Sequence, residues 1–207
     1  MTRVKVCGIT NLDDALAALE AGADLLGFNF YARSPRRVRP EEARRVVERL
    51  PEVVECVGVF VNEPAPEDVE EIAREAGLAS VQLHGDETPE YCQSLRGLTT
   101  IKALRVGADY NVETAAAYQT DAVLLDAYVA GERGGTGHTF DWSLAALTRA
   151  RVPRLFLAGG LNPDNVAAAV AAVRPYAVDV CSGVETAPGR KSPELVRRFV
   201  EAVGNGP

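Results

Sequence analysis

The chain has few cysteines and no long apolar run, and each of these features excludes a class of protein. Its four cysteines, at positions 7, 56, 92 and 181, form no C-x-x-C pair, so a zinc site or a disulfide framework is not expected and reduced thiols in a cytoplasm fit better. No apolar run approaches about 18 residues, and no signal-peptide pattern follows Met1. Neither a membrane span nor a secretion signal is therefore expected.

Positive charge is also scarce. Lys and Arg number 22 against 29 Asp and Glu, which gives a net charge of −7 and makes nucleic acid an unexpected partner. The most basic stretch, residues 33–45, holds six arginines but is interrupted by two prolines and two glutamates. Most of these arginines are expected only to cover an exposed helix.

Glycine and proline are present in ordinary amounts, 18 and 12 of 207 residues, which excludes collagen-like and disordered classes. The length suits one domain, and we expect that domain to span residues 1–207. A chain of this size buries about 70% of its unfolded surface, enough for a real core.

Short β-branched runs alternate with Ala-rich amphipathic segments along the whole chain. Strands are expected at residues 4–7, 25–30, 53–61, 80–83, 100–104, 122–126, 154–158 and 177–181. Most intervening segments start with a capping residue or a proline followed by acids, as in Thr88-Pro89-Glu90, and the weakest helix signal is Val112–Ala117.

Eight such units of about 26 residues predict an α/β fold, a single (β/α)8 TIM barrel of near-minimal length. The alternative, an open doubly wound sheet, favours a G-x-G-x-x-G motif after the first strand. Cys7-Gly8-Ile9-Thr10 is not such a motif.

In a barrel of this kind, functional residues collect where the strands end. Gly159-Gly160 and Ser182-Gly183 follow strands seven and eight, and glycine allows backbone N–H groups to approach an anion, so a phosphate site is expected there. The alternative is that these glycines form only tight turns. A third glycine cluster, residues 131–139, is typical of a lid or a ligand loop.

Cys7 and Asp126 end strands one and six and are the acid–base candidates. The helix that follows Cys7 would stabilise a thiolate able to remove a proton. Burial after the apolar residues 122–125 would favour a protonated Asp126 that can donate one. The alternatives are an inert core cysteine and an aspartate paired with an interior lysine, Lys5 or Lys102.

Ordered motifs along nearly the whole chain carry a family resemblance. They are KVCGIT at 5–10, GF at 27–28, SPR at 34–36, GVFVN at 58–62, VQLHG at 81–85, LLD at 124–126, GGTG at 134–137, FDW at 140–142, LAGGL at 157–161 and SGVE at 182–185. In these motifs the chain resembles the phosphoribosylanthranilate isomerases of tryptophan biosynthesis.

The resemblance implies an Amadori rearrangement of a small phosphorylated substrate, with no cofactor and no metal. It makes Cys7 the general base and Asp126 the general acid, and it gives Arg36 the anthranilate carboxylate. Gly159, Gly160, Ser182 and Gly183 would hold the phosphate. A homodimer is compatible with a barrel this small.

The chain departs from the family at two positions, with Cys181 in place of a serine and His138 in place of the usual lysine. Other sugar-phosphate barrels fit less well. A metal-dependent epimerase needs histidines where Asn29 and Asn62 stand, and the isomerase of histidine biosynthesis needs an aspartate in place of Cys7. Indoleglycerol-phosphate synthase uses a lysine as its acid, and a non-catalytic phosphometabolite-binding barrel has no need of an acid–base pair.

Overall fold

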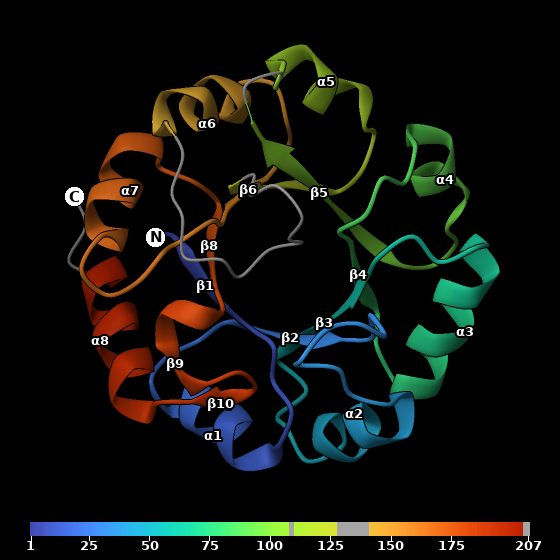
Figure 1. The fold of residues 1–207 in the computed structure, drawn as a ribbon, viewed down its shortest axis with the longest axis vertical. Coiled ribbons are helices and arrows are strands. Elements are labelled where there is room, and N and C mark those ends of the chain that lie inside the picture. Colours follow the sequence, from blue (N-terminus) through green and yellow to red (C-terminus); the bar gives the residue numbers. More distant parts are fainter. Residues whose placement is uncertain (108–109, 128–140, 205–207) are drawn as a thin grey trace.

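The computed structural model describes residues 1–107, 110–127 and 141–204, which form a closed barrel of parallel strands ringed by helices (Figure 1). The strands are β1 (Arg3–Cys7), β2 (Leu25–Asn29), β3 (Glu55–Phe60), β4 (Ser80–Leu83), β5 (Thr99–Val106), β6 (Ala122–Ala127), β7 (Leu155–Leu157) and β8 (Ala177–Val180). The helices are α1 (Leu12–Glu20), α2 (Pro40–Val47), α3 (Pro66–Ala76), α4 (Pro89–Ser94), α5 (Val112–Ala117), α6 (Trp142–Arg149), α7 (Val166–Val173) and α8 (Pro193–Gly204).

Pairing of the first strand with the last closes the barrel. Val4 on β1 lies opposite Val178 on β8, and every strand also pairs with its neighbour in sequence. The predicted (β/α)8 barrel is thus confirmed and the open sheet is excluded. The weak fifth helix is present as Val112–Ala117, with the Asn111 side chain accepting a hydrogen bond from its first turn.

The alternation of side chains along each strand divides the core into two layers. One set, including Leu25, Val57, Ile101, Leu124 and Phe156, forms a compact cluster inside the barrel. The other set forms the larger cluster between the strands and the surrounding helices. Residues of the inner set recur at every second position of a strand. The side chains that continue this alternation beyond the inner cluster therefore point into the open end of the barrel.

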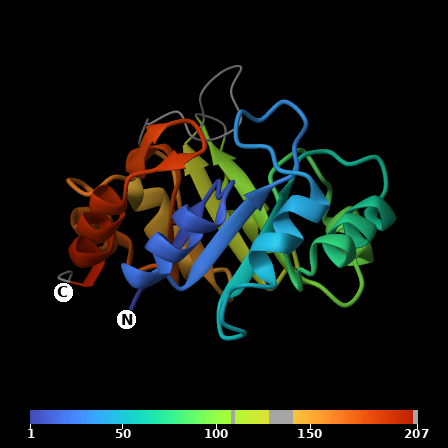
Figure 2. The ribbon, with the colours of Figure 1, turned by 90° about the horizontal axis from the view of Figure 1, so that it is seen from below.

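Three features differ from the expected elements. β3 begins at Glu55, because residues 51–54 form a turn, and β7 is limited to Leu155–Leu157. A short 3₁₀ helix, Ser182–Val184, is followed by a hairpin that the sequence did not predict, β9 (Glu185–Ala187) and β10 (Arg190–Lys191). Figure 2 shows this hairpin and the segment between β2 and α2 rising on the face toward which the strands point.

The arginines of residues 33–45 are exposed except Arg36, which is half-buried. Five of the six are therefore on the surface, but the expectation that most of them cover a helix is wrong, because only Arg44 and Arg45 belong to α2. The glycine cluster 131–139 and His138 lie outside the described residues. Among the described residues, none of the helices has the length and apolar character needed to cross a membrane.

Candidate active site

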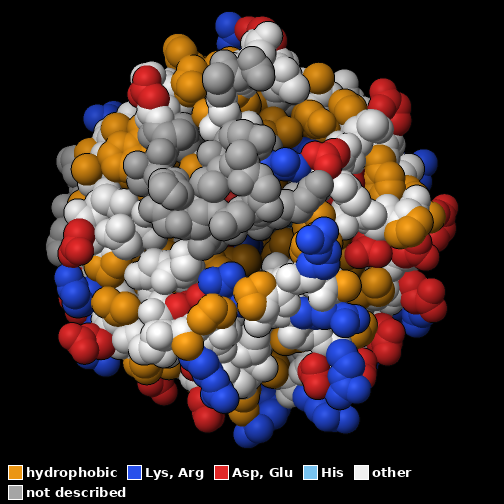
Figure 3. Space-filling view, viewed as in Figure 1, with side chains coloured by type: hydrophobic (Ala, Val, Ile, Leu, Met, Phe, Trp, Pro, Cys, Tyr) orange, Lys and Arg blue, Asp and Glu red, His pale blue; other side chains and the backbone are white. Residues whose placement is uncertain are grey.

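A cavity of about 370 Å³ opens at the end of the barrel where the strands terminate. Its lining includes residues from several strands and the loops that follow them: Cys7, Asn29, Tyr31, Arg33, Ser34, Pro35, Arg36, Val59, Val61, Gln82, His84, Asp126, Ala158, Gly159, Gly160, Leu161, Asp179, Cys181 and Ser182. Figure 3 views the molecule from the direction of Figure 1, with Lys and Arg side chains around the hollow and many acids at the periphery.

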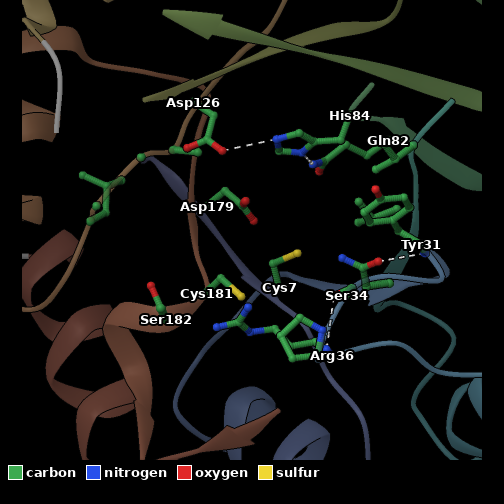
Figure 4. A pocket seen from close by; sticks show the side chains of 18 of the residues that line it. Cys7, Tyr31, Ser34, Arg36, Gln82, His84, Asp126, Asp179, Cys181 and Ser182 are labelled. Atoms are coloured by element: carbon green, nitrogen blue, oxygen red, sulfur yellow. Dashed lines mark hydrogen bonds and ion pairs between the residues drawn. The ribbon is translucent and has the colours of Figure 1, made fainter. Parts of the chain in front are cut away.

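These residues meet because side chains two positions apart on a strand point to the same side of it. Leu124 belongs to the cluster inside the barrel, so Asp126, two positions later, points the same way at the end of β6. Cys7 and Asp179 lie on the same faces of β1 and β8 as Lys5 and Ala177. Figure 4 shows Cys7 with Asp126 and Arg36 on its two sides.

Cys7 is 8% exposed and lies at the C-terminal end of β1, beside Cys181 from the end of β8. The Cys181 thiol, as hydrogen-bond partner, lowers the pKa of Cys7, with the charges of Lys5 and Lys191 acting in the same direction against burial and Asp179. Burial and the same partnership raise the pKa of the Cys181 thiol. The pair therefore favours a thiolate on Cys7 and a neutral thiol on Cys181.

Asp126 is 5% exposed and contacts a histidine, not a lysine. Its Oδ2 lies 3.2 Å from His84 Nε2, in a geometry out of line for a hydrogen bond. His84 Nδ1 is 2.8 Å from Gln82 Nε2, which fixes the ring. The two interior lysines are engaged elsewhere, Lys5 with Asp179 at 2.8 Å and Lys102 with Glu87 at 2.7 Å. The alternative pairing of Asp126 with a lysine is wrong.

Arg36 reaches the cavity from the loop between β2 and α2. Its backbone N–H donates to Ser34 Oγ at 3.1 Å, and its side chain passes over Gly8, where a Cβ would lie 2.6 Å from Arg36 Cδ. The guanidinium is bidentate to Glu185, with Nε 2.9 Å from Oε1 and Nη2 2.7 Å from Oε2. This pairing raises the pKa of Arg36 further, so the arginine carries its charge into the cavity.

The two loops after β7 and β8 each contain glycines that a larger residue would not replace freely, for different reasons. Gly159 and Gly160 have φ of +87° and +64°, and a Cβ on Gly183 would collide with the Leu161 carbonyl of the neighbouring loop. Asn165 Nδ2 donates to Gly160 O at 2.9 Å and holds the first loop in place. The two loops lie against each other at one wall of the cavity.

The seven residues predicted for the site all belong to this end of the barrel, and all except Gly183 line the cavity. Sequence reasoning missed the contribution of four others: Gln82, Asp179, Glu185 and Lys191. Two of them could have been found from the alternation of side chains along a strand. Gln82 and Asp179 lie two positions before His84 and Cys181 and therefore share their inward face. Among the described residues, no group of three or more His, Cys, Asp or Glu is placed to hold a metal ion.

Comparisons with known proteins agree on one family. The family model for N-(5'phosphoribosyl)anthranilate (PRA) isomerase matches residues 4–202. The N-(5'-phosphoribosyl)anthranilate isomerase of Trichlorobacter lovleyi is 53% identical over 200 residues, 97% of each chain, and that of Thermotoga neapolitana is 50% identical over 202 residues, 97% of this chain and 98% of its own.

Solved structures give the same result. The phosphoribosyl anthranilate isomerase of Thermotoga maritima superposes with a TM-score of 0.92 at 46% identity over 99% of both chains, and that of Thermus thermophilus with 0.90 at 41% over 98% of both. A 3-hexulose-6-phosphate synthase from Salmonella typhimurium, 14% identical over the full length of both chains with a TM-score of 0.71, shares the fold alone. This chain belongs to the phosphoribosylanthranilate isomerase family, enzymes of tryptophan biosynthesis.

Proposed function

We propose that the cavity binds N-(5-phosphoribosyl)anthranilate and that Cys7 and Asp126 catalyse its Amadori rearrangement to 1-(2-carboxyphenylamino)-1-deoxyribulose 5-phosphate. The observation that carries the proposal is the placement of a thiol and a carboxyl in one cavity with an arginine and two glycine loops. A related isomerase has been solved in complex with reduced 1-(o-carboxyphenylamino)-1-deoxyribulose 5-phosphate, at 45% identity over 99% of both chains and a TM-score of 0.89.

The reaction begins with the acid. Asp126 protonates the furanose ring oxygen, the ring opens, and the substrate's own nitrogen becomes a protonated Schiff base. The positive charge of this iminium acidifies the neighbouring carbon. Because that electron sink forms from the substrate, the proposal requires no pyridoxal and no metal.

The base completes the rearrangement. The Cys7 thiolate removes the proton from the acidified carbon, and the resulting enolamine tautomerises to the ketone. The hydrogen bond with Cys181 and the charges of Lys5 and Lys191 support this role because they lower the pKa of Cys7 despite its burial. A thiolate is therefore available at a pH where an ordinary thiol is mostly protonated.

The two ends of the substrate carry its negative charges. Arg36 lies where it can hold the anthranilate carboxylate, since a guanidinium matches a carboxylate with two parallel hydrogen bonds. Gly159, Gly160, Ser182 and Gly183 bind the phosphate through backbone N–H groups. Among the described residues, none accepts a hydrogen bond from the backbone N–H groups of Gly160 and Gly183, which leaves those donors for a ligand.

The test is a turnover assay. Freshly made phosphoribosylanthranilate is mixed with the purified chain, and the loss of anthranilate-type fluorescence is followed for the unaltered chain, Cys7→Ala and Asp126→Asn. Cys56→Ser is the matched control, because Cys56 lies outside the cavity. Absence of turnover by the unaltered chain would favour a non-catalytic binding barrel, while undiminished turnover by Cys7→Ala would refute the role of the thiolate.

We also propose that the whole chain acts as one barrel domain in the cytoplasm, where its four free cysteines stay reduced. A homodimer is supported by the related Thermotoga maritima isomerase, 45% identical, which is described as dimeric. Light scattering decides the assembly by giving a mass of either one or two copies of the 22.1 kDa chain.

A further inference from the structure

Three charged side chains form a buried row beside the cavity. Arg36 donates to Glu185 through Nε and Nη2, and Lys191 Nζ donates to Glu185 Oε1 at 2.8 Å. The side chains of Glu185 and Lys191 are only 4% and 1% exposed, against 13% for Arg36. Of the three, only Arg36 lines the cavity. The other two therefore act on a ligand's carboxylate through Arg36, while Lys191 Nζ also donates to Cys181 O at 3.3 Å and its charge helps to lower the pKa of Cys7.

The contact with Glu185 determines which edge of the guanidinium is left for a ligand. A guanidinium has five N–H donors in one plane, and Glu185 takes the edge formed by Nε and Nη2. The remaining edge consists of Nη1 and the second N–H of Nη2. No described residue accepts a hydrogen bond from Nη1. That edge matches the two oxygens of a carboxylate.

Glu185 would cancel the charge of Arg36 if the two were alone. Lys191 adds a second positive charge, so the three groups together carry +1 and not 0. Burial raises the pKa of Glu185, but hydrogen bonds from Arg36 and Lys191 more than offset that effect and lower it. Glu185 is thus ionised at neutral pH, and the positive charge of the row depends on Lys191.

The hairpin β9–β10 holds the row in place. Glu185 opens β9 and Lys191 closes β10, and the Gly189 N–H at the turn also donates to Glu185 Oε1 at 3.2 Å. Thr10 Oγ1 donates to Gly189 O at 2.7 Å, and the Lys191 backbone N–H donates to Asp14 Oδ2 at 2.9 Å. The turn of the hairpin and the end of β10 are therefore anchored to the segment around α1.

We propose that Glu185 and Lys191 are positioning residues for the carboxylate subsite: Glu185 orients Arg36, and Lys191 supplies the net positive charge that makes the oriented arginine attractive to an anion. Lys191 then determines substrate affinity without touching the substrate. This inference rests on the proposed function, in which Arg36 binds the anthranilate carboxylate. It also gives a role to the hairpin, whose two short strands form a sheet separate from the barrel.

The test compares Lys191→Met with the double variant Glu185→Gln/Lys191→Met. The single variant leaves Arg36 neutralised by Glu185, so the net charge of the row falls to 0 and KM should rise about tenfold or more. Because Lys191 also helps to lower the pKa of Cys7, kcat is compared on the plateau of its pH profile, where it should stay within about threefold. The double variant removes both charges, returns the row to +1, and keeps an oxygen on residue 185 that accepts from Arg36. Its KM should lie within about threefold of the unaltered chain.

Two probe ligands separate a charge effect from damage to the cavity. Inhibition by anthranilate should weaken in Lys191→Met roughly in parallel with KM, whereas inhibition by inorganic phosphate should weaken less, because the proposed phosphate site uses backbone N–H groups and not the Arg36 guanidinium that Glu185 neutralises. Thermal melting shows whether each variant is folded. The double variant keeps the test valid if Lys191→Met alone does not fold, because the inference requires the double variant to retain affinity.

Specific outcomes overturn the inference. One is a KM for folded Lys191→Met within twofold of the unaltered chain, and another is a double variant as impaired as the single one. Equal weakening of both probe ligands would also refute it. Failure of the proposed function is distinguishable, since it would be seen as absence of turnover by the unaltered chain before any variant is made.

Discussion

Gly159 allows the geometry of the site to be tested by a single methyl group. Its φ is +87°, and a Cβ at this position would lie 2.5 Å from the backbone nitrogen of Ala127. Ala127 is a buried residue of β6 and directly follows Asp126. Gly159→Ala therefore strains its own backbone and also pushes against the strand that carries the proposed acid.

Gly77 provides the matched control. It ends α3 with a φ of +73°, and a Cβ there would meet nothing within 4 Å. A left-handed φ costs an alanine about 1–2 kcal/mol, of which the stiffer unfolded chain returns about 0.4–1 kcal/mol. Gly77→Ala should thus lose about 1 kcal/mol of unfolding free energy, with unchanged kcat and KM.

Gly159→Ala carries the same backbone cost plus the collision with Ala127. Overpacking against backbone that cannot rotate away costs about 1–3 kcal/mol, so the variant should lose about 2–4 kcal/mol in total. For a chain of this size about 2–4 °C of melting temperature corresponds to each kcal/mol. Gly159→Ala should therefore melt about 2–12 °C below Gly77→Ala.

Activity provides a second measurement on the same pair. Displacement of Asp126 should lower kcat about tenfold or more in Gly159→Ala, and displacement of the backbone donors of this loop from the phosphate should raise KM. Thermal denaturation and steady-state kinetics on the two variants are sufficient. Equal melting temperatures for both variants, or a Gly159→Ala enzyme with normal kcat, would refute the contact between the β7 loop and β6.

Three further predictions concern the acid–base pair and the carboxylate subsite. Because the pKa of Cys7 is lowered in the folded chain, its alkylation rate and kcat/KM should rise with pH and level off well below about pH 8.5, the approximate pKa of a free thiol. Alkylation of Cys56, whose pKa burial raises to about 11, should stay slow over the same range. A midpoint near about pH 8.5 for Cys7 would contradict this prediction. Arg36→Ala should raise KM about tenfold or more with a smaller change in kcat, and an unchanged KM would remove its proposed role. His84→Ala should lower kcat more than it raises KM, because His84 lies 3.2 Å from Asp126 Oδ2, and steady-state kinetics with kcat unaffected would show that the contact is only structural.

Much of the barrel could be predicted from the sequence because its signals are local. Runs that are apolar at successive positions indicate strands covered on both faces, and prolines or capping residues mark the helix starts. The same reasoning brought Cys7, Asp126 and the glycine loops to one end, since parallel strands end at a common edge. What it could not supply was the partner of each polar side chain, as the contact of Asp126 with His84 shows.

The hairpin was missed for a physical reason. Strands of three and two residues are too short to show an alternating pattern, and their pairing depends on contacts with a distant part of the chain. The hydrogen bonds between Arg36 and Glu185 join residues 149 positions apart. Composition and periodicity carry no signal for a pairing of that range, whereas burial of a glutamate and a lysine after the last strand of the barrel is visible only in the fold.

The local charge of the row formed by Arg36, Glu185 and Lys191 differs in sign from the net charge of the whole chain. A net charge of −7 opposes an anionic substrate at long range, yet exposed charges are largely screened beyond about 8–10 Å at physiological salt. Buried charges are screened much less, so one uncancelled positive charge next to Arg36 outweighs many surface acids at the moment of binding. Glu185 alone would orient the Arg36 guanidinium but would also cancel its positive charge. A second buried cation, Lys191, allows the site to keep both the fixed geometry of the arginine and its attraction for a carboxylate.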